Sequence, residues 1–242
     1  MRRACRAAAL ALASVVKAAG PGTTTRELDR IAEDRIRALG GVPSFLGYRG
    51  YPASLCVSVN DEVVHGIPGP RRLREGEIVS LDLGAIVDGF HGDLAVTVPV
   101  NGIAEDLRRL LQVAAASLEE GIRQVRPGGH MGDVSAAVQR YVERHGFSVV
   151  REFAGHGVGR RLHEEPQVPN FGLPGTGVEL KPGMTFAIEP MVNAGSADVV
   201  VDSDGWTVRT KDRKPSAHFE HTVAVTETGV DVLTRLPEDA SV

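Results

Sequence analysis

Two aspartates, Asp82 and Asp93, flank a predicted β-hairpin and could share one ligand. Asp88-Gly89 is a two-residue turn signal between two runs rich in β-branched residues. Such a turn sets the pairing of opposite residues, which is Ile86 with His91, Gly84 with Asp93 and Asp82 with Ala95. The two carboxylates then lie on one sheet face with Cβ atoms roughly 7–8 Å apart. Buried like charges need a cation between them, so the pair predicts a divalent-metal site. Two solvated aspartates on an exposed face are the alternative.

Two histidines and two glutamates could complete such a site. His156 lies between two glycines, which let the backbone approach a site closely, and His163 follows it in the same segment. Glu189 ends an apolar run and Glu220 enters another, although Glu is disfavoured inside strands. The alternatives are surface histidines in a loop and charges that protect edge strands from aggregation.

A set of carboxylates with a little imidazole favours a particular kind of metal site. It suits a pair of Mn(II), Fe(II) or Co(II) ions better than a structural zinc, which prefers Cys and His. A carboxylate-bridged pair about 3.5–4 Å apart lowers the pKa of a bridging water and polarises a scissile carbonyl. The residues therefore indicate metal-dependent hydrolysis.

The elements that must position these groups recur along the chain. Each half holds a helical run, a Pro-Gly break, a second helix and a Gly stop, and matched positions are offset by 106 residues. They are Pro21-Gly22 with Pro127-Gly128, Leu28, Ala32 and Ile36 with Val134, Val138 and Val142, and Gly40 with Gly146. The constant offset predicts an internal duplication. Thr24 with Glu27 has capping-box spacing, and Asp133 is the expected N-cap of the later helix.

Strand-like runs lie between and after the helices, rich in Val, Ile, Thr and Phe and bounded by turn residues. They are SLCVSV, EIVSLDLGAIV, FHGDLAVTVPV, MTFAIEPMV, WTVRT and HTVAVT. Together with the helices they predict an α+β fold whose sheets form one curved antiparallel surface. No low-complexity linker interrupts the chain, so we expect one catalytic domain over residues 1–242, with similar halves at roughly 1–102 and 103–242.

Composition restricts the possible partners. The chain is 42% hydrophobic and 24% charged with a net charge of −4, which does not indicate nucleic acid or a membrane as a partner. Cys5 and Cys56 cannot build a disulfide framework, which suits a reducing compartment and predicts a cytoplasmic protein. The Ala-rich N-terminus superficially resembles a secretory signal, but Arg6 and weak hydrophobicity favour the first helix of the fold.

Five spaced motifs strongly resemble those of type I methionine aminopeptidases over nearly the whole chain. They are VSVNDEVVHGIPG, DLGAIVDGFHGD, GHGVGRRLHEEP, FAIEPMV and DRKPSAHFEHTV. The resemblance implies the duplicated pita-bread fold, with two pairs of helices on the outer face of the sheet. The sequence shows neither an N-terminal zinc-binding extension nor a large insertion, which suggests the compact bacterial form.

The resemblance also implies the roles of individual residues. Two divalent ions, Co, Mn or Fe(II), are expected on Asp82, Asp93, His156, Glu189 and Glu220. Asp93 and Glu220 are expected to bridge the ions, and a metal-bridging hydroxide to attack the scissile carbonyl with Glu189 as general base. His163 is expected to stabilise the oxyanion, and His65 to position the substrate or transfer a proton.

A methionine pocket and a weaker cation site complete the implied machinery. The expected pocket residues are Phe45, Tyr48, Tyr51, Cys56 and Trp206. Asn60 and Ser216 match positions that hold a monovalent cation in some relatives. Phe45, Leu162 and His218 depart from residues common in the family, which affects the expected shape of the pocket and leaves the metal ligands complete.

The implied function is removal of N-terminal methionine from nascent proteins, near the ribosome, with a small second residue preferred and the enzyme acting as a monomer. One alternative is a Pro-directed peptidase of the same fold, such as prolidase or aminopeptidase P, which usually adds a large N-terminal domain. Others are a metal-free binding scaffold, which would normally have lost ligands, and an unrelated α+β domain with scattered acids.

Overall fold

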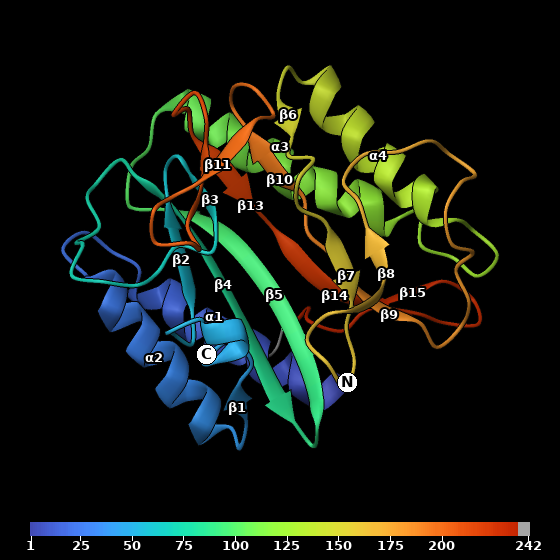
Figure 1. Cartoon of the computed structure of the whole chain (residues 1–242), viewed down its shortest axis with the longest axis horizontal. Helices are drawn as coiled ribbons and strands as arrows, with labels where there is room; N and C mark the ends of the chain where they lie inside the picture. The colour runs from blue at the N-terminus through green and yellow to red at the C-terminus, as the bar shows by residue number, and fades with distance from the viewer. Residues whose placement is uncertain (237–242) are drawn as a thin grey trace.

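The computed structural model describes residues 1–236, and residues 237–242 lie outside this part. Within it, four α-helices form two consecutive pairs (Figure 1). The pairs are α1 (Arg2–Ala18) with α2 (Thr25–Ala38), and α3 (Glu105–Ile122) with α4 (Met131–Arg144). A short 3-10 helix covers Tyr48–Gly50. Among the residues described, no helix is long and apolar enough to cross a membrane.

The main sheet is antiparallel and curved, and nine of the strands found in residues 1–236 belong to it (Figure 1). In spatial order its path is β1 (Val42–Pro43), β4 (Ile78–Val87), β5 (Phe90–Pro99), β14 (Glu220–Val225), β9 (Thr185–Ile188), β7 (Gly155–Gly157) and β8 (Glu164–Val168). Off this path, β2 (Cys56–Val59) pairs with β4, and β15 (Val230–Val232) pairs with β14. The α+β prediction is confirmed, and so is the curved antiparallel sheet.

Two small sheets extend the main one. The first orders β13 (Ser216–His218), β10 (Met191–Asn193) and β6 (Ser148–Val149), and the second orders β11 (Val199–Val201), β12 (Val208–Thr210) and β3 (Glu62–Val64). The strand-like run MTFAIEPMV therefore contributes to two strands, because β9 and β10 belong to different sheets, and Glu189 follows the end of β9, as expected of a residue at a strand end. Pro190 lies between them and has no N–H to donate to a ladder.

The predicted duplication is visible in the helices. Each bound of α4 lies 106 residues after the corresponding bound of α2. The glycines that stop the two helices, Gly40 and Gly146, have φ values of +76° and +81°, and those of the Pro-Gly breaks are likewise positive. A left-handed backbone favours glycine, which explains why this residue recurs at matched positions. The boundary between halves at residues 102 and 103 stays a prediction.

At the N-terminal ends of α2 and α4, an acidic side chain of the third helical residue accepts the N–H of the N-cap residue. Thr24 Oγ1 accepts the Glu27 N–H at 3.2 Å, and the Glu27 carboxylate accepts the Thr24 N–H at 2.7 Å, which confirms the capping box. The expectation that Asp133 is the N-cap of α4 is wrong. His130 occupies that position, and Asp133 is the third helical residue, whose carboxylate accepts the His130 N–H at 3.0 Å.

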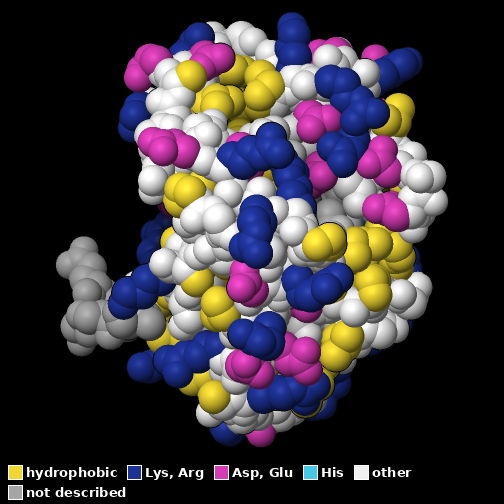
Figure 2. Space-filling view, turned by 90° about the vertical axis from the view of Figure 1, so that its left-hand side faces the viewer, with side chains coloured by type: hydrophobic (Ala, Val, Ile, Leu, Met, Phe, Trp, Pro, Cys, Tyr) yellow, Lys and Arg dark blue, Asp and Glu magenta, His cyan; other side chains and the backbone are white. Residues whose placement is uncertain are grey.

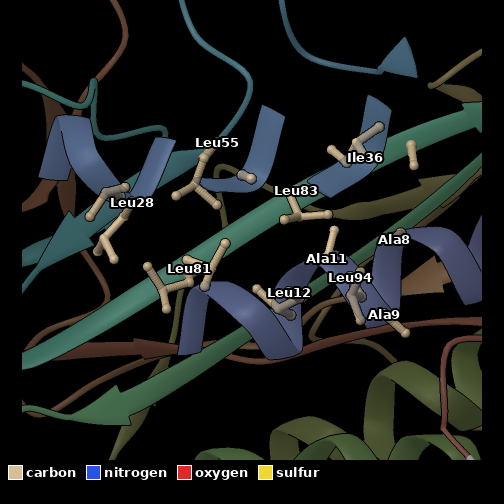
Figure 3. Close-up of a cluster of buried hydrophobic side chains, with 14 of the residues drawn as sticks. Ala8, Ala9, Ala11, Leu12, Leu28, Ile36, Leu55, Leu81, Leu83 and Leu94 are labelled. Atoms are coloured by element: carbon tan, nitrogen blue, oxygen red, sulfur yellow. The ribbon is translucent and has the colours of Figure 1, made fainter. Parts of the chain in front are cut away.

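A buried apolar layer joins α1 and α2 to the main sheet (Figure 3). Leu81 and Leu83 of β4 face these helices, so Asp82, which alternates with them, faces the opposite side of the sheet. Helix α1 packs closely on β5, because a Cβ added at Gly92 of β5 would lie 2.6 Å from the Cα of Cys5 in α1. The N-terminal stretch is thus a packed helix of the fold, as predicted.

Candidate metal centre and substrate pocket

The predicted hairpin brings Asp82 and Asp93 together. Asp88 and Gly89 have φ values of +52° and +74°, the signs that the favoured two-residue hairpin turn requires. The observed register pairs Ile86 with His91, Gly84 with Asp93 and Asp82 with Ala95. Both side chains are buried, at 9% and 3% exposure. The two carboxylates are therefore diagonal neighbours in the protein interior, and the reading as solvated surface aspartates is wrong.

Neighbouring strands bring the remaining predicted ligands to the same place. Glu220 of β14 pairs with Ala95 of β5, so Glu220 and Asp82 flank Ala95 in one row across three strands. Glu189 follows directly after β9, which pairs with β14, and His156 lies in β7, which pairs with β9. Four of the groups lie in strands of the main sheet and Glu189 directly follows a fifth, so the ladders between these strands fix their relative positions.

The distances are short enough for a shared cation. One ligand atom from each of Asp93, His156 and Glu220 lies within 4.8 Å of the others. His156 Nε2 is 3.9 Å from Asp93 Oδ2 and 3.5 Å from Glu189 Oε1. His156 Nδ1 faces the Gly157 carbonyl at 3.0 Å, so its Nε2 is the nitrogen that points toward the carboxylates.

The electrostatics of the cluster fit divalent ions. Burial, together with repulsion from neighbouring carboxylates, raises the pKa of Asp82, Glu189 and Glu220 well above their usual range, and burial raises that of Asp93 to about 7. Among the described residues, Asp82 Oδ1, Asp93 Oδ1 and Glu220 Oε1 are buried without a hydrogen-bond partner. Oxygen atoms that lack protein donors, with one imidazole beside them, form a suitable donor set for two metal ions.

His163 and His65 lie on the wall of the adjoining cavity. The His163 ring packs 4.0 Å from the His156 ring, and its Nδ1 is 2.7 Å from the Tyr48 hydroxyl. Loss of hydration and nearby positive groups lower the pKa of His163 to about 3. Burial lowers the pKa of His65 to about 4, and its φ of +60° is a strained conformation of the kind found at functional sites.

The cavity has a volume of about 520 Å³ and contains both the acidic cluster and an apolar end. All five predicted pocket residues line it: Phe45, Tyr48, Tyr51, Cys56 and Trp206. Tyr51 and Trp206 pack edge to face at 5.0 Å, and the Tyr51 hydroxyl, with one proton to donate, lies within hydrogen-bond distance of both the Leu55 and the Gly66 carbonyl, at 3.1 and 3.0 Å. Because the Tyr51 hydroxyl is hydrogen-bonded to the backbone, the part of Tyr51 that faces the cavity is its apolar ring.

Several residues of the site were not predicted from the sequence. Phe153, Phe171 and Met191 line the cavity. Phe153 and Phe171 lie outside the five recognised motifs, and Met191 lies inside FAIEPMV, where a single apolar residue in an apolar run gave no signal of its own. His218 appeared in the sequence only as a departure from the family pattern. In the structure its Nε2 is 3.7 Å from Glu189 Oε2, and burial lowers the pKa of the ring to about 3.

Asn60 and Ser216, the weaker cation candidates, are neighbours in the structure. The Ser216 N–H donates to the Asn60 carbonyl at 2.8 Å, and Asn60 has a left-handed φ of +57°. The Ser216 hydroxyl donates to Asn193 Oδ1 at 2.8 Å. Their role in binding a monovalent cation stays a prediction.

Comparisons with known proteins agree with this geometry. The model of metallopeptidase family M24 matches residues 1–227. Methionine aminopeptidase 1 of Bacillus subtilis is 54% identical over 236 residues, which is 98% of this chain and 95% of that protein. The methionine aminopeptidase of Escherichia coli K12 is 47% identical over 241 residues, which is 99% of this chain and 91% of that protein.

Solved structures give the same result. The crystal structure of methionine aminopeptidase from Rickettsia prowazekii superposes with a TM-score of 0.96 at 42% identity, over 97% of this chain and 95% of that one. Prolidase from Pyrococcus furiosus shares the fold at a TM-score of 0.78 and 20% identity, but this chain covers only 63% of it. The chain belongs to metallopeptidase family M24, and within it to the type I methionine aminopeptidases that its motifs resemble.

Proposed function

We propose that the chain removes the N-terminal methionine of nascent polypeptides with the help of two divalent ions. The observation that carries this proposal is the continuity of one cavity, whose walls include both the buried carboxylate cluster and an apolar end. The cluster would hold the reactive centre, and the apolar end, lined by residues such as Phe45, Tyr51 and Trp206, would receive the methionine side chain. Relatives named methionine aminopeptidase over nearly the whole chain support the same substrate.

For the division of ligands between the two ions we adopt the assignment that the family resemblance implies. Asp93 and Glu220 would be shared by both ions, Asp82 would complete one, and His156 with Glu189 the other. Co, Mn and Fe(II) suit this mixture of oxygen and nitrogen donors. When bound, such ions lower the pKa of a shared water, which becomes the nucleophile at neutral pH, and polarise the scissile carbonyl.

The side chains around this centre handle protons and charge. Glu189, at the edge of the cluster, accepts the proton of the attacking water and passes it toward the leaving amine. His163 is uncharged at neutral pH, and Tyr48 contacts its Nδ1, so its Nε2 can face the substrate and donate to the oxyanion as it forms. His65, which lines the same cavity beside Phe153 and Trp206, would position the substrate amine.

The apolar end selects methionine. Phe45, Tyr51, Cys56 and Leu162 are buried together, with Tyr48 and Trp206 packed against them. A flexible, polarisable thioether makes favourable contacts with such aromatic walls. The ring of His163 stacks on Tyr48 and packs at a tilt against His156, which forms a wall of rings beside the centre, so we expect large second residues to be rejected by steric clash.

We further propose that the enzyme works as a cytoplasmic monomer near the ribosome, where new N-termini emerge. The face shown in Figure 2 carries positive and negative side chains interspersed, which favours neither nucleic-acid binding nor a strongly charged partner on that face.

Hydrolysis of defined peptides tests the proposed function. After chelation, activity on Met-Ala-Ser should vanish, and Mn(II), Co(II) or Fe(II) should restore it. Met-Ala-Ser should be cleaved much faster than Met-Lys-Ser or Ala-Pro-Ala. Full activity in thoroughly demetallated protein would contradict the dinuclear site, equal rates on Met-Ala-Ser and Met-Lys-Ser would contradict the small-residue preference, and a preference for Ala-Pro-Ala would indicate a Pro-directed peptidase.

A further inference from the structure

His218 is a buried histidine whose ring nitrogens both lack a hydrogen-bond partner among the described residues. Its position is fixed by the backbone. The His218 N–H donates to Thr97 Oγ1 at 2.8 Å, and its carbonyl lies 2.8 Å from the same hydroxyl, which also contacts Ser80 Oγ. Leaving a polar ring buried without partners costs free energy, so the ring needs an explanation beyond filling space.

The Glu189 carboxylate lies between two imidazoles. Its Oε1 is 3.5 Å from His156 Nε2, on the side of the ligand cluster, and its Oε2 is 3.7 Å from His218 Nε2, on the outer side. The Glu189 backbone is held separately, because Asn170 Nδ2 donates to the Glu189 carbonyl at 3.1 Å. A small rotation of the carboxylate alone therefore brings Oε2 within hydrogen-bond range of His218 Nε2.

We propose that His218 donates its Nε2–H to Glu189 Oε2 and thereby holds Oε1 toward the ions that the proposed function requires. His218 is then a positioning residue that acts through Glu189 and does not touch the ions or the substrate. A neutral imidazole suits this place because it supplies one donor without adding a charge that competes with the metals. Hydrogen bonds to ligating carboxylates of this kind typically change metal affinity about 10–100-fold.

Three substitutions separate positioning from space filling. In His218→Leu the donor is lost but apolar volume is kept, in His218→Gln an N–H of similar reach remains, and in His218→Asn the donor is too short to reach Glu189. His145→Gln, at the half-buried residue that follows the C-terminal end of α4, controls for adventitious metal binding by histidine. Isothermal titration of each metal-free full-length variant with Mn(II) gives the affinity, and thermal melting without metal gives the stability of the fold.

The expected result is a Kd for Mn(II) about 10–100-fold weaker in H218L, recovery to within a few-fold of wild type in H218Q, and no change in H145Q. Metal-free H218L should melt no lower than wild type, since two unpaired buried nitrogens are removed. At saturating Mn(II), kcat of H218L should stay reduced while KM for Met-Ala-Ser is unchanged. If H218L does not fold, the affinities of H218N and H218Q for Mn(II) test the proposal instead. H218N should then bind Mn(II) about 10–100-fold more weakly than wild type, and H218Q within a few-fold of it.

Wild-type affinity for Mn(II) in folded H218L, or equally weak binding in H218Q and H218L, would overturn the proposal. The same holds if H218N binds as tightly as H218Q. Failure of the wild-type protein itself to bind Mn(II) would instead refute the proposed metal-dependent function, so the two failures are distinguishable.

Discussion

Replacing Asp93 with Asn should make the metal-free protein more stable while destroying metal binding. Asp93 is 3% exposed, one of its oxygens has no partner in the described structure, and burial raises its pKa from 3.8 to about 7. A carboxyl whose folded-state pKa is raised favours folding below pH 3.8, and that contribution is lost as the pH rises through 7. At pH 8 the native state therefore holds an ionised group that its surroundings disfavour.

The magnitude follows from the displacement of the pKa. At about 1.4 kcal/mol per pH unit, a rise from 3.8 to about 7 corresponds to roughly 4 kcal/mol of destabilisation at pH 8. Asn is neutral and nearly isosteric with Asp, so Asp93→Asn should recover most of this lost free energy of unfolding. For a chain of this size, ~2–4 °C of Tm per kcal/mol predicts an increase of roughly 8–16 °C in Tm.

The assay is thermal melting in chelator from pH 5 to 8, with and without Mn(II). The advantage of D93N should shrink toward pH 5, where wild-type Asp93 is protonated in the folded state. Mn(II) should raise the Tm of wild type but not of D93N, because a ligand that binds only the native state stabilises it. Asp88→Asn, an exposed carboxyl, is the matched control and should change little. A metal-free D93N that melts below wild type at pH 8 would refute this account of the cluster.

Three further predictions concern other parts of the molecule. Glu189→Gln should lower kcat by at least ~10²–10⁴-fold. His163→Ala should keep the metal content and lower kcat about 10²–10³-fold with little change in KM. Metal analysis together with steady-state kinetics checks both variants. Gly92→Ala should lower the Tm, because the new Cβ meets the backbone of Cys5 in α1, and an unchanged melting curve would contradict the close packing. Deletion of residues 2–18 should give insoluble or inactive protein, as measured by the soluble yield and activity, because α1 covers one side of the core.

The parts of the site that depend on local chemistry could be predicted from the sequence. Asp88-Gly89 specifies a two-residue turn, the turn fixes the register, and the register places Asp93 diagonally opposite Asp82. The duplication could also be found, because left-handed glycines such as Gly40 and Gly146 recur where the two helices stop. In both cases a few neighbouring residues determine the geometry.

The assembly of distant segments could not be derived in this way. Nothing local indicates that β14 pairs with β5, which brings Glu220 beside Ala95, or that β7 brings His156 to the same face. Family resemblance supplied these positions as expectations. The resemblance marked His218 only as a departure and gave it no role. The role that we propose depends on the 3.7 Å distance between His218 Nε2 and Glu189 Oε2, which only the folded chain shows.

The site has a structural reason to span both halves of the molecule. Asp82 and Asp93 come from the hairpin of the first half, whereas His156, Glu189 and Glu220 come from strands of the second, and the ladder between β5 and β14 joins the two groups. Neither half alone brings all five of the proposed ligands. Because the cluster is costly to bury without metal, the apolar layers that pack the helices onto the sheet must supply the free energy that keeps the carboxylates together. The duplicated fold thus holds mutually repelling carboxylates together, at the place where we propose that metal ions bind.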